Sequence, residues 1–276
     1  MNHHDRRLDR ACGVLYGLAA GDALGMPTQL LPRWRLAGLF PKLDGFVDGP
    51  EENVLSSGVP AGSVTDDTEQ AVVLAEVLIE GRGRLDSGEF VRRFLAWAEE
   101  AEADGSEKLG PSSRRALEAV RRGVPPEEAG RRGETSGAAM RVAPVGIAAP
   151  PEPLGVLLEL VEEACRPTHN TGLAISGAAA VAAAVSAGVE GAAFGEALRL
   201  ARAAAREGSG RGGYAAGAEV AERISWATEL VLGLDEGDAA EALYRLVGTA
   251  GWLPRKRCRR PSPSPRATRG THGGRA

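Results

Sequence analysis

The sequence predicts an all-α fold built from many helices. Hydrophobic residues make up 43% of its 276 residues but aromatic residues only 4%, and 37 glycines stand beside abundant alanine. Alanine is the best helix former, whereas strands favour the β-branched and aromatic residues that are scarce here. Apolar residues also recur at helical spacing along most of the chain. We therefore expect small side chains in the core and close packing of helix against helix.

The elements follow from this periodicity. The first helix is predicted over residues 7–24, and a second begins after residue 65. Asp86 and Glu89 form a capping-box pattern before the next helix, whose aromatic residues Phe90, Phe94 and Trp97 are interpreted as core. Later helices are predicted over residues 112–122, 126–131, 137–142, 153–165, 172–187, 191–206, 215–232 and 238–247.

Two stretches rich in small residues have different interpretations. Residues 32–62, with many glycines and prolines, are interpreted as one long loop that delivers the segment after it. Residues 172–187 consist largely of glycine, alanine and serine, which let two helices approach closely. We expect this second stretch to be the central helix of the fold.

The segment 63–70 carries the most chemistry. Asp66 and Asp67 are adjacent carboxylates with Thr65 and Thr68 on either side, where the long loop meets a helix. In one interpretation Thr65 caps the helix and the aspartates favour the positive end of its dipole. In the other, these hard oxygen atoms bind Mg²⁺ or Mn²⁺, which removes the repulsion between neighbouring carboxylates.

Three further features are ambiguous in the sequence. Asp22 lies in the glycine-rich stretch 21–25 at the end of the first helix and is either a structural cap or a site residue. His169 precedes the central helix, and a lone histidine is more often structural than functional. Residues 208–213 match G-x-G-x-x-G, but no strand precedes them, so we interpret them as a flexible connection.

Targeting and redox features favour the cytoplasm. Cys12, Cys165 and Cys258 are far apart and lack metal-binding spacing, which argues against a disulfide framework or a zinc site. The N-terminus has no apolar run typical of a signal peptide. No segment has the roughly twenty apolar residues of a spanning helix, so no membrane partner is expected.

The end of the chain has a different composition. From Arg255 onward there are eight basic residues and no acidic one, although the net charge of the whole chain is −4. We predict a helical domain over residues 1–250 and a basic, disordered tail over residues 251–276. A frameshift or truncated reading would produce this change, and we prefer it to an evolved nucleic-acid-binding tail. No specific nucleic-acid partner is expected, although such a tail can bind polyanions non-specifically.

Four ordered blocks carry a resemblance to a known family. They are GVLYGLAAGDALGMPTQ at residues 13–29, GSVTDDTEQ at 62–70, MRVAPVG at 140–146 and THNTG at 168–172. Together they resemble the ADP-ribosylglycohydrolase family over about residues 10–250. The resemblance implies an orthogonal multi-helix bundle with a binuclear Mg²⁺ or Mn²⁺ centre. It also implies hydrolysis of the glycosidic bond between ADP-ribose and a protein side chain or related acceptor.

The resemblance implies roles for particular residues. Thr65, Asp66 and Asp67 would hold one metal ion, with Asp66 and Asp67 catalytic. Substrate-binding positions are implied at Asp22, Gly25, Gln29 and His169. Several family members have glutamate where this chain has Gln29, whose amide can orient a ligand but cannot act as a base. The implied partner is an ADP-ribosylated protein or a small molecule containing ADP-ribose.

One implied motif is absent. The family's second metal motif, a Gly-Asp-Thr-Asp-like segment at the start of a C-terminal helix, is replaced by the basic tail. Mg²⁺ prefers six oxygen ligands, and about three protein ligands remain. We therefore expect a C-terminally incomplete fold, a doubtful second metal ion and an impaired hydrolase. The alternative is a non-catalytic ADP-ribose-binding or structural helical protein.

Overall fold

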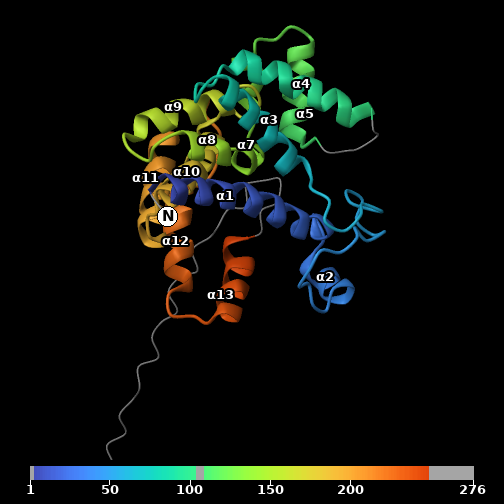
Figure 1. Ribbon diagram of the computed structural model, residues 1–276. Coiled ribbons are helices and arrows are strands. Elements are labelled where there is room, and N and C mark those ends of the chain that lie inside the picture. Colours follow the sequence, from blue (N-terminus) through green and yellow to red (C-terminus); the bar gives the residue numbers. More distant parts are fainter. Residues whose placement is uncertain (1–2, 104–108, 249–276) are drawn as a thin grey trace, which may run out of the picture.

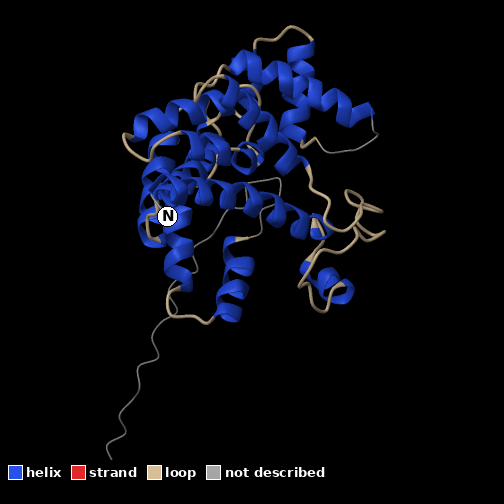
Figure 2. Cartoon of the chain, in the orientation of Figure 1, coloured by secondary structure: helices blue, strands red, loops and turns tan. Residues whose placement is uncertain are grey.

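The computed structural model describes residues 3–103 and 109–248, and every regular element among them is helical (Figures 1 and 2). This confirms the predicted all-α class. The β-type pairing within these two ranges is limited to one isolated bridge between Thr171 and Gly213. The predicted disordered tail over residues 251–276 lies outside the described residues.

Among the described residues, the longest stretch without helix lies between positions 39 and 66. In order the helices are α1 (His3–Gly25), α2 (Arg33–Leu39), α3 (Asp66–Glu80), α4 (Ser87–Ala103), α5 (Pro111–Arg121), α6 (Pro126–Ala129), α7 (Gly137–Arg141), α8 (Ala143–Ala148), α9 (Leu154–Cys165), α10 (Gly172–Glu190), α11 (Phe194–Gly208), α12 (Val220–Val231) and α13 (Glu236–Ala242). Short 3-10 turns cover Met26–Thr28 and Gly130–Arg132, and a π-helical turn covers Leu243–Val247.

The structure corrects two sequence-based expectations about these elements. The stretch 32–62 is not all loop, because it contains α2, a seven-residue helix with no buried residue and hence no clear apolar stripe. The glycine segment 208–213 is an ordered connection, since Gly213 N donates to Asn170 O at 2.9 Å and Gly213 O accepts from Gly172 N at 2.8 Å.

Helix α10 is central, as predicted. It packs against α7, α8, α9 and α11, and it also contacts α1 and α12 (Figure 1). Contrary to the expectation from the sequence, it is long and apolar enough to cross a membrane, but 67% of its apolar stretch is buried inside the protein. Its small side chains therefore serve contacts with neighbouring helices.

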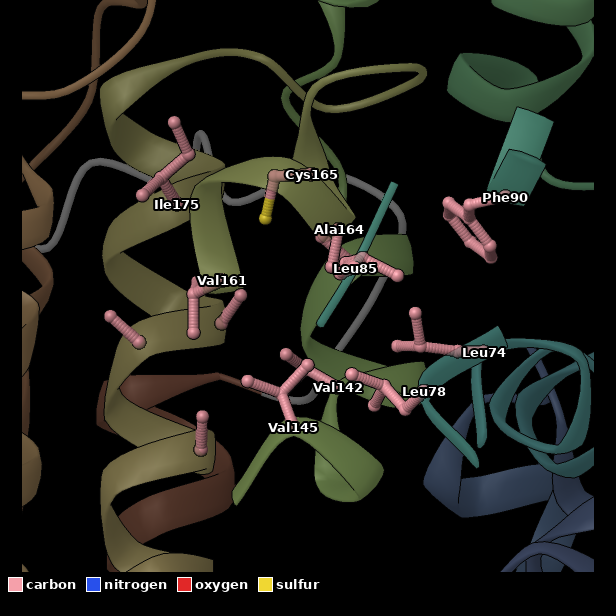
Figure 3. Close-up of a cluster of buried hydrophobic side chains, with 14 of the residues drawn as sticks. Leu74, Leu78, Leu85, Phe90, Val142, Val145, Val161, Ala164, Cys165 and Ile175 are labelled. Carbon is pink, nitrogen blue, oxygen red and sulfur yellow. The ribbon is translucent and has the colours of Figure 1, made fainter. Parts of the chain in front are cut away.

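The main core lies where α3, α4, α7, α8, α9 and α10 meet. Figure 3 shows side chains from these helices converging, among them Leu74 of α3, Val145 of α8 and Ile175 of α10. The rings of Phe90 and Phe94 stack with their centroids 5.6 Å apart, and both are fully buried. This confirms Phe90 and Phe94 as core residues, whereas Trp97 is partly buried and packs against the edge of the core.

Two helical glycines are expected to respond oppositely to alanine. A Cβ at Gly146 would lie 2.5 Å from the Ala182 carbonyl oxygen, whereas a Cβ at Gly177 would meet no atom within 4 Å. We expect Gly146→Ala to lower the free energy of unfolding by about 1–3 kcal/mol through overpacking. Gly177→Ala should raise it by up to about 1 kcal/mol through helix propensity. Urea denaturation of both variants checks this, and equal signs would contradict the close approach of α8 to α10.

Candidate active site

The carboxylate of Asp22, near the end of α1, hydrogen-bonds to the start of α3. Asp22 accepts hydrogen bonds from the backbone N–H and hydroxyl of Thr65, at 2.8 and 2.7 Å, and from those of Thr68, at 3.2 and 2.6 Å. Asp22 is thus a cap for a helix distant in sequence. The glycine-rich end of α1 and the Thr-Asp-Asp segment meet at one place in the fold.

Asp66 and Asp67 are gathered beside Asp22 in a partly buried position. Burial, and then the negative charges of Asp67 and Asp22, raise the pKa of Asp66 to about 7. Burial and the charge of Asp22 raise the pKa of Asp67 to about 6. Thr65 caps α3 by accepting from Asp67 N at 3.4 Å. The capping interpretation is therefore correct for Thr65, but it leaves the crowding of carboxylates unexplained.

The raised pKa of Asp66 predicts a pH effect on stability. An acid whose pKa is higher in the folded state binds more protons there, so folding weakens as pH rises from about 4 to about 7. Asp66→Asn removes this effect because the amide carries no charge. We expect the melting temperature of the variant, measured in EDTA, to exceed that of the wild type more at pH 7.5 than at pH 4.5. A constant difference across this range would contradict the crowding.

A chain of polar side chains leads from Asp66 into the core. Gln70 Nε2 donates to Asp66 Oδ2 at 3.1 Å, and Arg141 Nη1 donates to Gln70 Oε1 at 3.1 Å. Arg141 Nη2 then donates to Thr168 Oγ1 at 2.7 Å, and this hydroxyl lies 2.8 Å from His169 Nδ1. Gln70, Arg141, Thr168 and His169 are fully buried. The second and fourth sequence blocks are thus joined through Arg141 of the third.

The structure places His169, a predicted substrate-binding residue, in the interior. Its ring has no exposed surface, and Thr168 and Thr135 hydrogen-bond its two nitrogens at 2.8 and 2.9 Å. Burial, with the charge of Arg141, lowers its pKa well below the ordinary value, so the ring is neutral. A Cβ at Gly137 would lie 2.7 Å from its Cε1. In this structure His169 supports the loop before α7 from inside, and substrate binding by His169 stays a prediction.

Gly25 and Gln29 flank the 3-10 turn that follows α1. Gly25 ends the helix, and its carbonyl accepts from Thr28 Oγ1 at 2.8 Å. The buried Asn53 donates to the carbonyls of Pro27 and Gln29 at 3.2 and 2.9 Å. Asn53 thereby fixes the backbone that carries Gln29. Substrate binding by Gly25 and Gln29 stays a prediction.

Comparison with known proteins agrees with the arrangement of these blocks. The family model for ADP-ribosylglycohydrolase matches residues 3–256. The chain belongs to the ADP-ribosylglycohydrolase family. It is 36% identical to YegU of Escherichia coli K12, over 88% of this chain and 73% of YegU. It is 31% identical to the ADP-ribosylarginine hydrolase Tri1 of Pseudomonas putida, over 52% of this chain and 37% of Tri1.

A solved structure shares the fold of this family member. It is titled an ADP-ribosylglycohydrolase-related protein complex and aligns with a TM-score of 0.60 and 29% identity, covering 89% of this chain and 83% of its own. The likeness confirms the all-α ADP-ribosylglycohydrolase fold. The chain spans less of the length of Tri1 than of YegU.

The oxygen donors at the start of α3 fit one hard divalent cation. Thr65, Asp66 and Asp67 offer hydroxyl and carboxylate oxygens, which are the ligands that Mg²⁺ and Mn²⁺ prefer. Within residues 3–103 and 109–248, no group of three or more His, Cys, Asp or Glu residues is arranged to hold a metal ion. This finding covers Asp22, Asp66 and Asp67 as well, so the candidate site consists of two carboxylates and one hydroxyl.

Sequence reasoning missed four residues that organise the site of this family member. They are Gln70, Arg141, Thr135 and Asn53, each of which reaches a predicted site residue through a hydrogen bond to it or its neighbour. Gln70 lies one helical turn after Asp66, so its i,i+4 spacing was a usable signal. The partners of the other three are set by the tertiary fold alone.

Proposed function

We propose that this chain hydrolyses the glycosidic bond between ADP-ribose and a protein side chain, with Mg²⁺ or Mn²⁺ as cofactor. Membership of the ADP-ribosylglycohydrolase family supports the class of reaction. The observation that carries the metal dependence is the crowding of Asp66 and Asp67 beside Asp22, which raises the pKa of both carboxylates. A divalent cation would offset this repulsion.

Thr65, Asp66 and Asp67 are the residues proposed to hold the cation. When bound there, it would supply positive charge that orients the ribose hydroxyls and makes a nearby water more acidic. Hydrolysis adds the water oxygen to the anomeric carbon of the ribose, and the acceptor side chain leaves with a proton. In this proposal Asp66 or Asp67 would receive the proton that the attacking water loses.

The surrounding residues have positioning roles in this proposal. Asp22 keeps the start of α3 in place through its four hydrogen bonds. Gln29, on the turn held by Asn53, would orient the ligand through its amide because it cannot act as a base. His169, neutral and buried, would stabilise the loop before α7.

The first substrate to test is ADP-ribosylarginine, because the relative Tri1 is named as its hydrolase. We expect release of free ADP-ribose that requires Mg²⁺ or Mn²⁺ and stops on addition of EDTA. Release that continues unchanged in EDTA would contradict the proposed metal dependence. Absence of release from arginine-, serine- and other side-chain-linked substrates would contradict the proposed hydrolase.

A second candidate is a non-catalytic ADP-ribose-binding protein. It is favoured by the absence, among the described residues, of any acidic group of three or more arranged around a metal ion. Calorimetry with ADP-ribose separates the two candidates. Binding together with turnover supports the hydrolase, whereas binding without turnover of any linked substrate supports the binding protein.

A further inference from the structure

Among the described residues no carboxylate forms an ion pair with the buried Arg141, although the negative charge of Asp66 acts on it from a distance. Its guanidinium has no exposed surface and lies over the rings of Phe90 and Phe94, 5.4 and 5.1 Å from their centroids. Burial lowers its pKa to about 10, so it is still charged at neutral pH. Its hydrogen bonds go to Gln70 Oε1, Thr168 Oγ1 and the Ala164 carbonyl. Burying a charge among neutral partners costs free energy, so a purely structural role would be met better by an apolar side chain.

The hydrogen-bond donors of Arg141 fix the orientation of the Gln70 side-chain amide. A guanidinium has donors only, so it must face the amide oxygen of Gln70 and not the NH₂ group. The NH₂ group then points to Asp66 Oδ2, 3.1 Å away, where it can only donate. With the amide reversed, its oxygen would face the carboxylate and its NH₂ group would face Arg141, and both contacts would be repulsive.

We propose that Arg141 is a positioning residue for Asp66 that acts through Gln70. The two hydrogen bonds in series hold one oxygen of the Asp66 carboxylate in a fixed direction, at the helix start that also carries Thr65 and Asp67. This assignment rests on the proposed function only in taking Asp66 as the residue whose position matters for the cation. The link itself is a property of the fold and can be tested without turnover.

The test compares the wild type with Gln70→Met, which keeps the length of the side chain but removes both hydrogen bonds. Crystal structures of the two proteins give the position of the Asp66 carboxylate, and calorimetry gives the affinity for Mn²⁺. We expect the carboxylate to rotate or to occupy more than one position in Gln70→Met, and the affinity to fall about 10-fold, as is typical when a residue that orients a metal ligand is removed. Arg141→Lys, which retains a charge but not the fork of donors, should show the same changes to a smaller extent.

Ser186→Ala is the matched control. Ser186 is also buried and donates one hydrogen bond, to the Ala149 carbonyl at 2.6 Å, but it lies in α10 outside the chain of contacts that ends at Asp66. The Ser186→Ala variant should be less stable than the wild type, with unchanged Mn²⁺ affinity and an unchanged position of the Asp66 carboxylate. An equal loss of affinity in Ser186→Ala and Gln70→Met would show a general effect of destabilisation and overturn the proposal.

The outcomes separate this inference from the proposed function. If the wild type binds Mn²⁺ and Gln70→Met binds it within twofold, with the Asp66 carboxylate unmoved, the positioning role is overturned and the metal site stands. If the wild type binds no Mn²⁺, the proposed metal dependence fails, and the crystal structures alone decide. A displaced Asp66 in Gln70→Met then supports the link, and an unmoved one overturns it.

Discussion

Asp66→Asn and Asp67→Asn should each lower the rate of ADP-ribose release at least about 100-fold. The amide keeps the size of the side chain but loses the negative charge that the cation and the attacking water both require. Because the crowding of charge is relieved, neither variant should unfold more easily than the wild type at neutral pH. Initial rates with saturating Mg²⁺, together with melting curves, measure both effects.

Asp86→Asn provides a control for these two variants. Asp86 also lies at a helix start and accepts a hydrogen bond from Glu89 N at 2.8 Å, but it directly precedes α4 and is not part of the Thr-Asp-Asp segment. Its rate should stay within about twofold of the wild type. Loss of activity in all three variants would point to helix capping, whereas full activity in Asp66→Asn and Asp67→Asn would remove both aspartates from the mechanism.

Asp22→Ala should cost about 2–4 kcal/mol of unfolding free energy. It removes the one acceptor of four hydrogen bonds that join α1 to the start of α3, and it leaves two threonine hydroxyls and two backbone N–H groups to find other partners. Urea denaturation measures the loss. The change should also lower activity, because Asp66 and Asp67 follow directly from Thr65.

The comparison variant for Asp22 is Asp235→Ala. Asp235 caps α13 with a single hydrogen bond to Asp238 N at 2.9 Å, so its loss should cost only about 1 kcal/mol. Equal losses in the two variants would mean that Asp22 is an ordinary helix cap. A larger loss in Asp22→Ala, together with lower activity, would show that the tie between α1 and α3 maintains the site.

The fold was predictable because local signals and tertiary packing agree along most of this chain. The alanine- and glycine-rich helix α10 could be identified as central from its composition, and Phe90 and Phe94 as core from their spacing. Helix α2 could not be predicted from the sequence. It has only seven residues and buries none of them, so it has no apolar face that would show as a periodic pattern.

The site was only partly predictable. Thr65, Asp66 and Asp67 are adjacent in sequence, so their proximity followed directly. Whether Asp22 caps its own helix or another could not be decided locally, since its partners lie 43 and 46 residues away. The burial of His169 and the position of Arg141 depend on how α3, α7 and α9 pack together. This packing cannot be predicted from the pattern of one sequence.

Titration of the purified full chain with Mn²⁺ by calorimetry at pH 7.5 tests the central claim most directly. The account predicts saturable binding to the wild type and its loss when Asp66 and Asp67 are both replaced by alanine. Heat of binding that is absent from the wild type, or unchanged in the double variant, would contradict the proposal that these oxygen atoms at the start of α3 hold a cation.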